Sequence, residues 1–201
     1  MGWWRRNRWA LAGLPLALAA ALVASSHRVS SFYWTSGLHD ARPGTQGVWL
    51  EHRDLLLDAS GEVPVAVEVR LEGVADTTEP WESSVPFTLP HGTRAVRVDL
   101  TLRATPDAPL RACSLAVRDA DGTRYDYRWD AAGAVQPASP CVPPAAPGPW
   151  QDLLADEGDE DEPARPGEWR VSPVVVVPAG VEVAEVLLWW EPPTYVALAV
   201  D

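Results

Sequence analysis

The chain of 201 residues contains no lysine and no isoleucine, and all 16 of its basic residues are arginine. Without lysine, the protein can form neither a Schiff base with a carbonyl substrate nor the lysine–phosphate contact of a P-loop. The sequence also lacks the G-x-S-x-G motif of α/β-hydrolases and the H-E-x-x-H motif of zinc proteases. These absences exclude several large enzyme classes. We therefore predict a protein that is not an enzyme and that carries no cofactor.

Cysteine is also scarce, since Cys113 and Cys141 are the only two. A pair without a neighbouring histidine makes a poor zinc site. Outside the cytoplasm such a pair usually forms a disulfide, so we expect a Cys113–Cys141 bridge. The bridge would close a loop of about 29 residues, which stabilises the fold by roughly 3–4 kcal/mol in the chain-entropy model.

The charge is strongly acidic and unevenly distributed. The net charge is −12, with 16 basic residues against 28 acidic ones. Residues 1–30 hold four arginines and no acid, so the remainder has 12 arginines against 28 acids, a net charge of −16. A domain this acidic repels phosphate backbones, so we expect no nucleic-acid partner.

An apolar stretch near the N-terminus predicts a transmembrane helix over residues 9–29. Its uncharged part, Trp9 to Ser26, spans about 18 residues, or roughly 27 Å of helix, close to the ~30 Å hydrocarbon core of a bilayer. Arginines precede it, so the positive-inside rule places residues 1–8 in the cytoplasm and the chain after about residue 30 outside. The residues expected at the membrane interfaces are Arg5, Arg6, Arg8, Trp9 and Trp34.

The same stretch has a second interpretation, as a cleaved signal peptide. Ala24-Ser25-Ser26 is a small-x-small triplet that a signal peptidase could cut after Ser26. The apolar region of a signal peptide usually has only about 7–15 residues, so the greater length of this one favours a retained signal-anchor.

Residues 47–201 show the pattern of short β-strands, after a polar juxtamembrane stalk at residues 30–46. The clearest strand is 63–71, where valine or leucine occupies every odd position and proline, alanine, glutamate and arginine occupy the even ones. Asp121-Gly122 predicts a tight hairpin turn. About nine such strands, with no convincing soluble helix, predict an all-β fold, an antiparallel β-sandwich.

Residues 131–167 interrupt this pattern with a proline-rich half and an acidic run. We expect a long exposed insertion, pinned to the sandwich at Cys141. The acidic run at 156–162 is more typical of a solvated segment, or one that meets a basic partner, than of a cation site. Asp119-x-Asp121-Gly122 resembles the start of a calcium loop, but the later ligands of such a loop are missing, so we predict no metal site.

The eleven tryptophans exceed what a core of this size needs. Trp129 and Trp169 are predicted to lie in the core, together with one of the adjacent Trp189 and Trp190, because neighbours in a strand point to opposite faces. Exposed tryptophans can anchor protein partners or stack on sugars, but they can equally cover one end of the sandwich, which is the interpretation we favour. The candidate partner contacts are Trp49, Trp81 and Trp150.

Three segments together carry a resemblance to a known class of domain. They are AVRVDLTLRA followed by the turn PDAP, then LRACSLAVRDADGTRYDY, and later VSPVVVVPAGVEVAEVLLWW. Over roughly residues 94–200 this order resembles the small immunoglobulin-like β-sandwiches on the outside of Gram-positive cells. The residue usage, rich in amino acids with G/C-rich codons, indicates a bacterium with a high-G+C genome, such as an actinobacterium. The resemblance implies an immunoglobulin-like fold and no particular activity.

We therefore expect a single-pass protein of the bacterial cell membrane that contacts the bilayer through its N-terminal helix. Its extracytoplasmic β-sandwich would act as a non-catalytic binding or scaffold module for another envelope protein. The alternative is a secreted sandwich, released after Ser26, that binds a glycan or another ligand. A pocket that brought His52 or His91 together with carboxylates would instead favour an enzyme.

Overall fold

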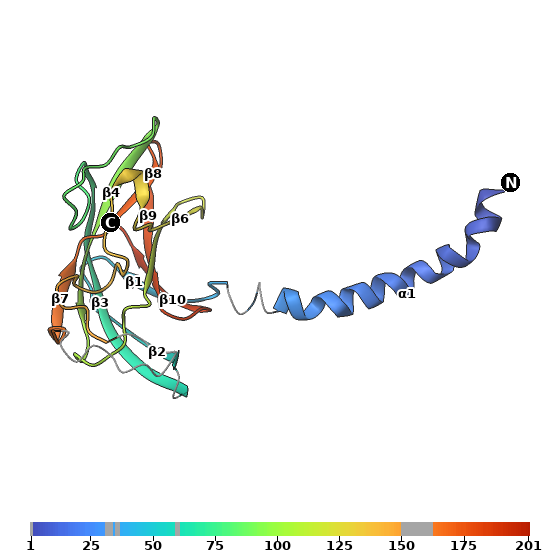
Figure 1. The fold of residues 1–201 in the computed structure, drawn as a ribbon, viewed down its shortest axis with the longest axis horizontal. Coiled ribbons are helices and arrows are strands. Elements are labelled where there is room, and N and C mark those ends of the chain that lie inside the picture. The colour runs from blue at the N-terminus through green and yellow to red at the C-terminus, as the bar shows by residue number, and fades with distance from the viewer. Residues whose placement is uncertain (1, 31–33, 35–36, 59–60, 150–162) are drawn as a thin grey trace.

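The computed structural model describes residues 2–30, 34, 37–58, 61–149 and 163–201. A single helix, α1 (Trp3–Val29), projects away from a body of two β-sheets (Figure 1). The helix begins at Trp3 rather than near Trp9, because the basic segment before the apolar stretch contains no residue that breaks a helix. Residues 3–8, which we expected as a separate segment, are thus the first turns of α1.

The body consists of two five-stranded sheets that face each other. Sheet A has the order β1 (Asp40–Thr45), β10 (Thr194–Ala199), β9 (Val183–Trp189), β5 (Ser114–Asp119) and β6 (Arg124–Asp126). Sheet B has the order β2 (Leu50–Asp58), β3 (Gly61–Thr77), β4 (Thr93–Arg103) and β7 (Glu168–Val171), and β8 (Val174–Pro178) also pairs with β4. The short 3₁₀ turn η2 (Ala131–Gly133) lies between the strands β6 and β7. The predicted sandwich-like, mostly antiparallel architecture is confirmed.

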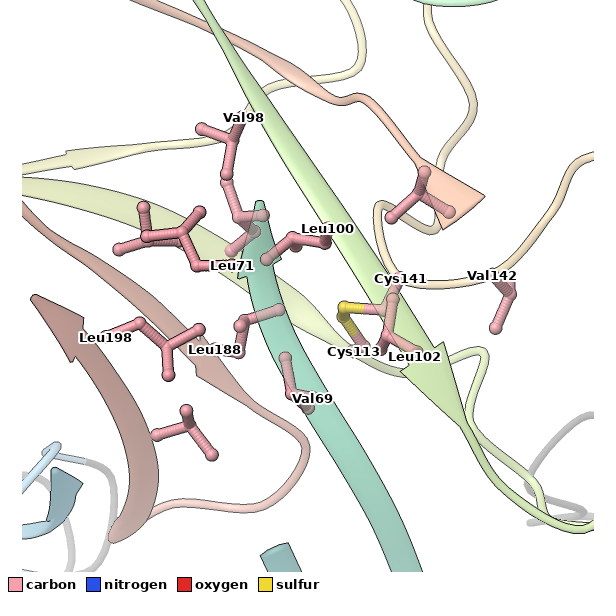
Figure 2. Close-up of a cluster of buried hydrophobic side chains, with 14 of the residues drawn as sticks. Val69, Leu71, Val98, Leu100, Leu102, Cys113, Cys141, Val142, Leu188 and Leu198 are labelled. Carbon is pink, nitrogen blue, oxygen red and sulfur yellow. A yellow bond between two sulfur atoms is a disulfide. The ribbon is translucent and has the colours of Figure 1, made fainter. Parts of the chain in front are cut away.

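The core fills the space between the sheets. The inward positions of β3 confirm the predicted alternation, since Val65, Val67, Val69 and Leu71 are all buried while their neighbours are more exposed. Side chains from both sheets meet in this layer (Figure 2). The labelled residues are Val69, Leu71, Val98, Leu100 and Leu102 from sheet B, Leu188 and Leu198 from sheet A, and Cys113, Cys141 and Val142 beside them. Alternation of period two on facing strands is what produces such a layer.

The stalk predicted at residues 30–46 is shorter than expected, because Asp40–Thr45 form β1. This strand pairs in parallel with β10, so the sandwich is not wholly antiparallel and has ten described strands rather than nine. The segment DARPGT has no hydrophobic alternation, and its pairing is provided by the edge of β10. Gly44 permits the close approach, since a Cβ atom there would lie 2.7 Å from Leu198 Cδ2.

The described parts of the 131–167 insertion are packed on the sandwich through several buried residues, while others, such as Val135, are exposed. Ala134, Cys141 and Val142 are almost completely buried. Gln136 explains how: its amide Nε2 donates to Val174 O, at 3.0 Å, and its Oε1 accepts from Val174 N, at 3.1 Å. The side chain thereby replaces a strand in pairing with β8. The acidic run at 156–162 lies outside the described residues.

Arg165 holds the far end of this insertion from inside the protein. Its side chain is almost completely buried, and its guanidinium donates to the backbone oxygens of Thr105, Ala108 and Pro147 at 2.8, 2.9 and 3.2 Å. The guanidinium carbon lies 4.7 Å from the centre of the Trp169 ring. Burial lowers the pKa of Arg165 to about 10, so the group remains charged at neutral pH.

The predicted Cys113–Cys141 disulfide is present (Figure 2). The two Cα atoms are 6.0 Å apart, within the usual range of about 4.4–6.8 Å. The bridge joins the start of β5 to the insertion, and Trp169 Nε1 donates to Cys141 O at 2.7 Å. Trp169 is therefore a core residue, as predicted, and it contacts both Arg165 and the disulfide loop.

The disulfide predicts a simple labelling result. The native full-length chain, denatured without reductant, should take up no alkylating agent, and it should take up two equivalents after reduction, because Cys113 and Cys141 are the only cysteines. Intact-mass measurement before and after reduction checks this. Two thiols that react without reductant would contradict the bridge.

Arg165→Ala should destabilise the full chain in detergent by about 3–5 kcal/mol, because three backbone carbonyls, one of them in a buried bond, lose their charged donor. Arg165→Lys should recover only part of this loss, since an ammonium cannot reproduce the planar fork or stack on Trp169. Thermal unfolding followed by circular dichroism measures the effect. The exposed Arg170 is the matched control, and Arg170→Ala should stay within about 0.5 kcal/mol of wild type. Equal stability of all variants would contradict this role of Arg165.

Candidate functional site

The predicted membrane-flanking residues lie at the two ends of α1. Arg5, Arg6, Arg8 and Trp9 belong to its first turns, and Trp9 is 79% exposed. Trp34 follows the helix, is 66% exposed, and has its ring centre 5.3 Å from that of His39. The helix is long and apolar enough to cross a membrane or to serve as a signal sequence. Together with the disulfide, it indicates an extracytoplasmic location.

The three candidate partner contacts have different surroundings. Trp49 is half-buried, with the guanidinium carbons of Arg70 and Arg103 at 4.6 and 4.0 Å from its ring centre. Trp81 is only 9% exposed and belongs to the core, where Gln136 Oε1 accepts from its backbone N–H. Its packing leaves it little surface for a partner. Trp150 lies outside the described residues.

The arginines around Trp49 belong to a charge-balanced outer face of sheet B. Arg70 pairs with Glu72 at 2.6 Å, and Arg103 pairs with Glu168 at 2.7 Å. A hydrogen bond from Thr101, followed by one from Arg70, holds the pKa of Glu72 below its usual value. Exposed ion pairs of this kind contribute only about 0–1 kcal/mol each, but they neutralise the face. This surface therefore has no strong preference for a charged partner.

Two other tryptophans, Trp129 and Trp189, share one recess. Trp129, predicted to lie in the core, is instead 52% exposed. The prediction assumed that the strand continues to Trp129, but β6 ends at Asp126. Trp189 points outward and Trp190 inward, as the alternation rule requires. Both Trp129 and Trp189 line one hollow of about 270 Å³, which we call the Trp129–Trp189 groove. Its other lining residues are Cys113, Ser114, Leu115, Asp126, Tyr127, Ala138 and Pro140.

Strand register explains the shape of this groove. Ser114 is the direct partner of Trp189 across β5 and β9, so a small side chain stands beside a large one. Asp126, on the edge strand β6, makes an ion pair with Arg124 at 2.8 Å. The Arg124 guanidinium carbon lies 5.5 Å from the centre of the Trp189 ring. The groove therefore combines aromatic surface with one carboxylate and one hydroxyl, and the Arg124 guanidinium lies beside it.

The wall that carries Trp129 is held by hydrogen bonds. Gln136 N donates to Trp129 O at 2.7 Å, and the Tyr127 hydroxyl donates to Pro137 O at 2.6 Å. Burial raises the pKa of Tyr127, so its hydroxyl keeps the proton for this bond at neutral pH. Tyr127 N also donates to Leu115 O at 2.8 Å, which ties the segment to β5. Ligand binding would therefore require little ordering of the groove.

His52, one of the two histidines singled out in the sequence, is buried beside a carboxylate. Its Nε2 lies 3.5 Å from Asp54 Oδ2, and its ring stacks on Trp190 with the ring centres 5.4 Å apart. Neither ring nitrogen has a hydrogen-bond partner within the described part of the chain. Burial lowers the pKa of His52, although Asp54 opposes that effect. His91 is exposed, on the turn before β4, and does not share this site.

The Asp119–Gly122 segment forms a hairpin turn, as the turn chemistry predicted. The Asp119 carboxylate accepts hydrogen bonds from Thr123 N at 2.8 Å and from the Tyr125 hydroxyl at 3.1 Å. Gly122 has a φ angle of 86°, which a glycine adopts without strain. Among the residues that the structure describes, no group of three or more histidine, cysteine, aspartate or glutamate side chains could hold a metal ion.

Comparison with known proteins places the chain in no family. No family model, no curated protein and no solved structure matches it.

His52 should make the stability of the protein fall in mild acid. Its folded-state pKa lies below the ordinary value of 6.5, so the unfolded chain takes up a proton first. His52 has no effect on stability well above pH 6.5 and lowers it progressively as the pH falls from 6.5 towards the folded pKa, by up to about 1.4 kcal/mol per pH unit. The other charged groups that act on it are Asp54, Arg42 and Asp40.

Chemical denaturation of the full chain in detergent between pH 7 and pH 5 measures this effect. In His52→Phe, which keeps a ring against Trp190, the part of the acid loss due to His52 should disappear. His91→Phe is the control and should retain the wild-type dependence on pH, since it leaves His52 in place. An unchanged pH dependence in His52→Phe would show that other groups cause the loss.

Proposed function

We propose that the protein is a single-pass membrane protein of the bacterial envelope, with its N-terminus in the cytoplasm and its sandwich outside. In this function the sandwich is a non-catalytic module that binds or scaffolds an envelope protein partner close to the membrane. The observation that carries the proposal is the apolar helix α1, which is followed at once by a disulfide-closed sandwich. The arginines before the apolar stretch support the orientation.

The local structure around Ser26 supports retention of the helix. The hydroxyls of Ser25 and Ser26 donate to Leu22 O and Val23 O, at 3.1 and 2.7 Å, which are bonds back to the preceding turn. The segment that a signal peptidase would cut is thus helical up to Val29. Proteases cleave extended backbone, so a helical cut site favours an anchor.

The topology supports an immunoglobulin-like sandwich as part of this proposal. The order β10-β9-β5 corresponds to strands G, F and C of that fold, and β3-β4-β8 corresponds to strands A, B and E. The disulfide departs from the pattern, because it joins the start of β5 to the insertion rather than one sheet to the other. The added strands β1 and β2 are a second departure.

A second candidate function is favoured by the Trp129–Trp189 groove. A secreted sandwich, released after Ser26, could use these two rings to bind a soluble ligand such as a glycan. The two functions differ in whether residues 1–26 remain on the mature protein.

Intact mass distinguishes the two functions directly. The native protein extracted from membranes should have its full-length mass, allowing for loss of Met1, because α1 is retained as an anchor. As a matched control, Ser26→Leu removes the small residue at the candidate cut site, and it should leave both the mass and the membrane fraction unchanged. A wild-type mass that lacks residues 1–26, restored to full length by Ser26→Leu, would show that the protein is secreted.

A further inference from the structure

We infer that the Trp129–Trp189 groove is a binding site for one pyranose ring of a glycan without anionic groups. The inference gives the anchored module a glycan ligand in addition to the protein partner proposed above, and it rests on the membrane-anchored binding function. It uses residues that come from β5, β6, β9 and the segment after β6, and that come together only in the fold.

The first argument is the exposure of Trp129. An indole that is 52% exposed keeps a large apolar face in water, whereas Trp81, Trp169 and Trp190 are at most 9% exposed. A pyranose ring has one face of C–H groups and a rim of hydroxyls, so it can cover an indole face and still hydrogen-bond at its edge. Burial of an aromatic face in this way is favourable, and a polar neighbour fixes the orientation of the ligand.

The second argument is the set of polar groups at the groove. Asp126 offers acceptor oxygens and Arg124 offers N–H donors, and their ion pair at 2.8 Å holds both in place. The two side chains remain 52% and 45% exposed, so their outer lone pairs and N–H groups are available to a ligand. Ser114 adds a hydroxyl that can donate or accept. Neighbouring hydroxyls of a sugar can donate to one such group and accept from the other.

Size and charge restrict the ligand further. A hollow of about 270 Å³ is slightly smaller than the ~300–1,000 Å³ of sites for drug-sized ligands, which suits a single sugar ring rather than a folded partner. The chain after residue 30 has a net charge of −16, counted from 12 arginines and 28 acids. This field repels anionic polymers and leaves neutral or N-acetylated sugars as the chemistry that fits.

The position of the groove relates it to the membrane. Trp189 ends β9 at the same end of sheet A where β1 and β10 begin, and Leu38 packs against the cluster that contains Trp189. In an anchored protein this end is connected to α1 by residues 30–39, which span at most about 35 Å when extended. The glycan that reaches the groove would therefore be one that lies near the membrane surface.

The test is a titration of the full chain in lipid nanodiscs with three uncharged tetrasaccharides. These are built of β-1,4-linked N-acetylglucosamine, β-1,4-linked glucose and α-linked mannose. Calorimetry should show binding of at least one of them. Saturation-transfer NMR should then show the strongest signals on the C–H protons of one ring face, where the indole lies.

Variants locate the site. Trp129→Ala and Asp126→Asn should each weaken binding at least tenfold, and both should fold, because these side chains are exposed. Trp49→Ala is the matched control, since Trp49 is partly exposed on the other sheet, and it should bind like wild type. The inference is overturned if no tetrasaccharide binds at millimolar concentration, or if Trp129→Ala binds as tightly as wild type. If the native protein is full-length and binds no sugar, the groove alone is overturned. If the native protein lacks residues 1–26 and binds sugar, the anchor alone is overturned.

Discussion

Buried backbone polar groups must be hydrogen-bonded, and in this protein that requirement determines how a long irregular segment covers the sandwich. Strand ladders satisfy the backbone groups of the sheets, whereas the described residues of the insertion form no strand. Buried side chains supply partners for carbonyls of the insertion and of the loop between β4 and β5. Arg165 donates to three carbonyls, Trp169 and Trp190 donate one indole N–H each, and Gln136 pairs with both backbone groups of Val174. Without these donors, coverage of the core by a proline-rich chain would leave orphaned carbonyls, each costing about 1–3 kcal/mol.

Much of the sheet structure could be predicted, because period-two alternation depends only on neighbouring residues. The burial of Val67 and Val69 and the inward orientation of Trp190 follow from that rule. The burial of residues outside strands does not follow from the alternation rule. Trp81 is buried although it lies outside a strand, and its backbone N–H bonds to Gln136 from a distant segment, whereas Trp129 is exposed because β6 ends at Asp126. These outcomes depend on contacts between remote parts of the chain, which spacing in the sequence does not record.

The candidate site could not be predicted for the same reason. The sequence shows that either Trp189 or Trp190 must point outward. It does not show that Ser114 lies beside Trp189, because that contact depends on the register of β5 against β9. The contrast between the two outer faces also emerges only in the fold. Sheet B presents paired arginines and acids that neutralise one another, whereas sheet A offers small residues and aromatic rings near its disulfide end. The recess that joins Trp129 and Trp189 to polar groups thus arises from contacts on the sheet A side of the described surface.

The parallel pairing of β1 with β10 has a consequence for the biogenesis of the protein. β1 is the first strand of the chain and β10 is the last, and β10 is the only described strand with which β1 pairs. If residues emerge from the membrane in chain order, β1 has no partner until the C-terminus has been exported. Closing such a long-range contact is slow and comes late in folding. The strand nearest to α1 is therefore the last to be incorporated, and truncation at the C-terminus would release it first.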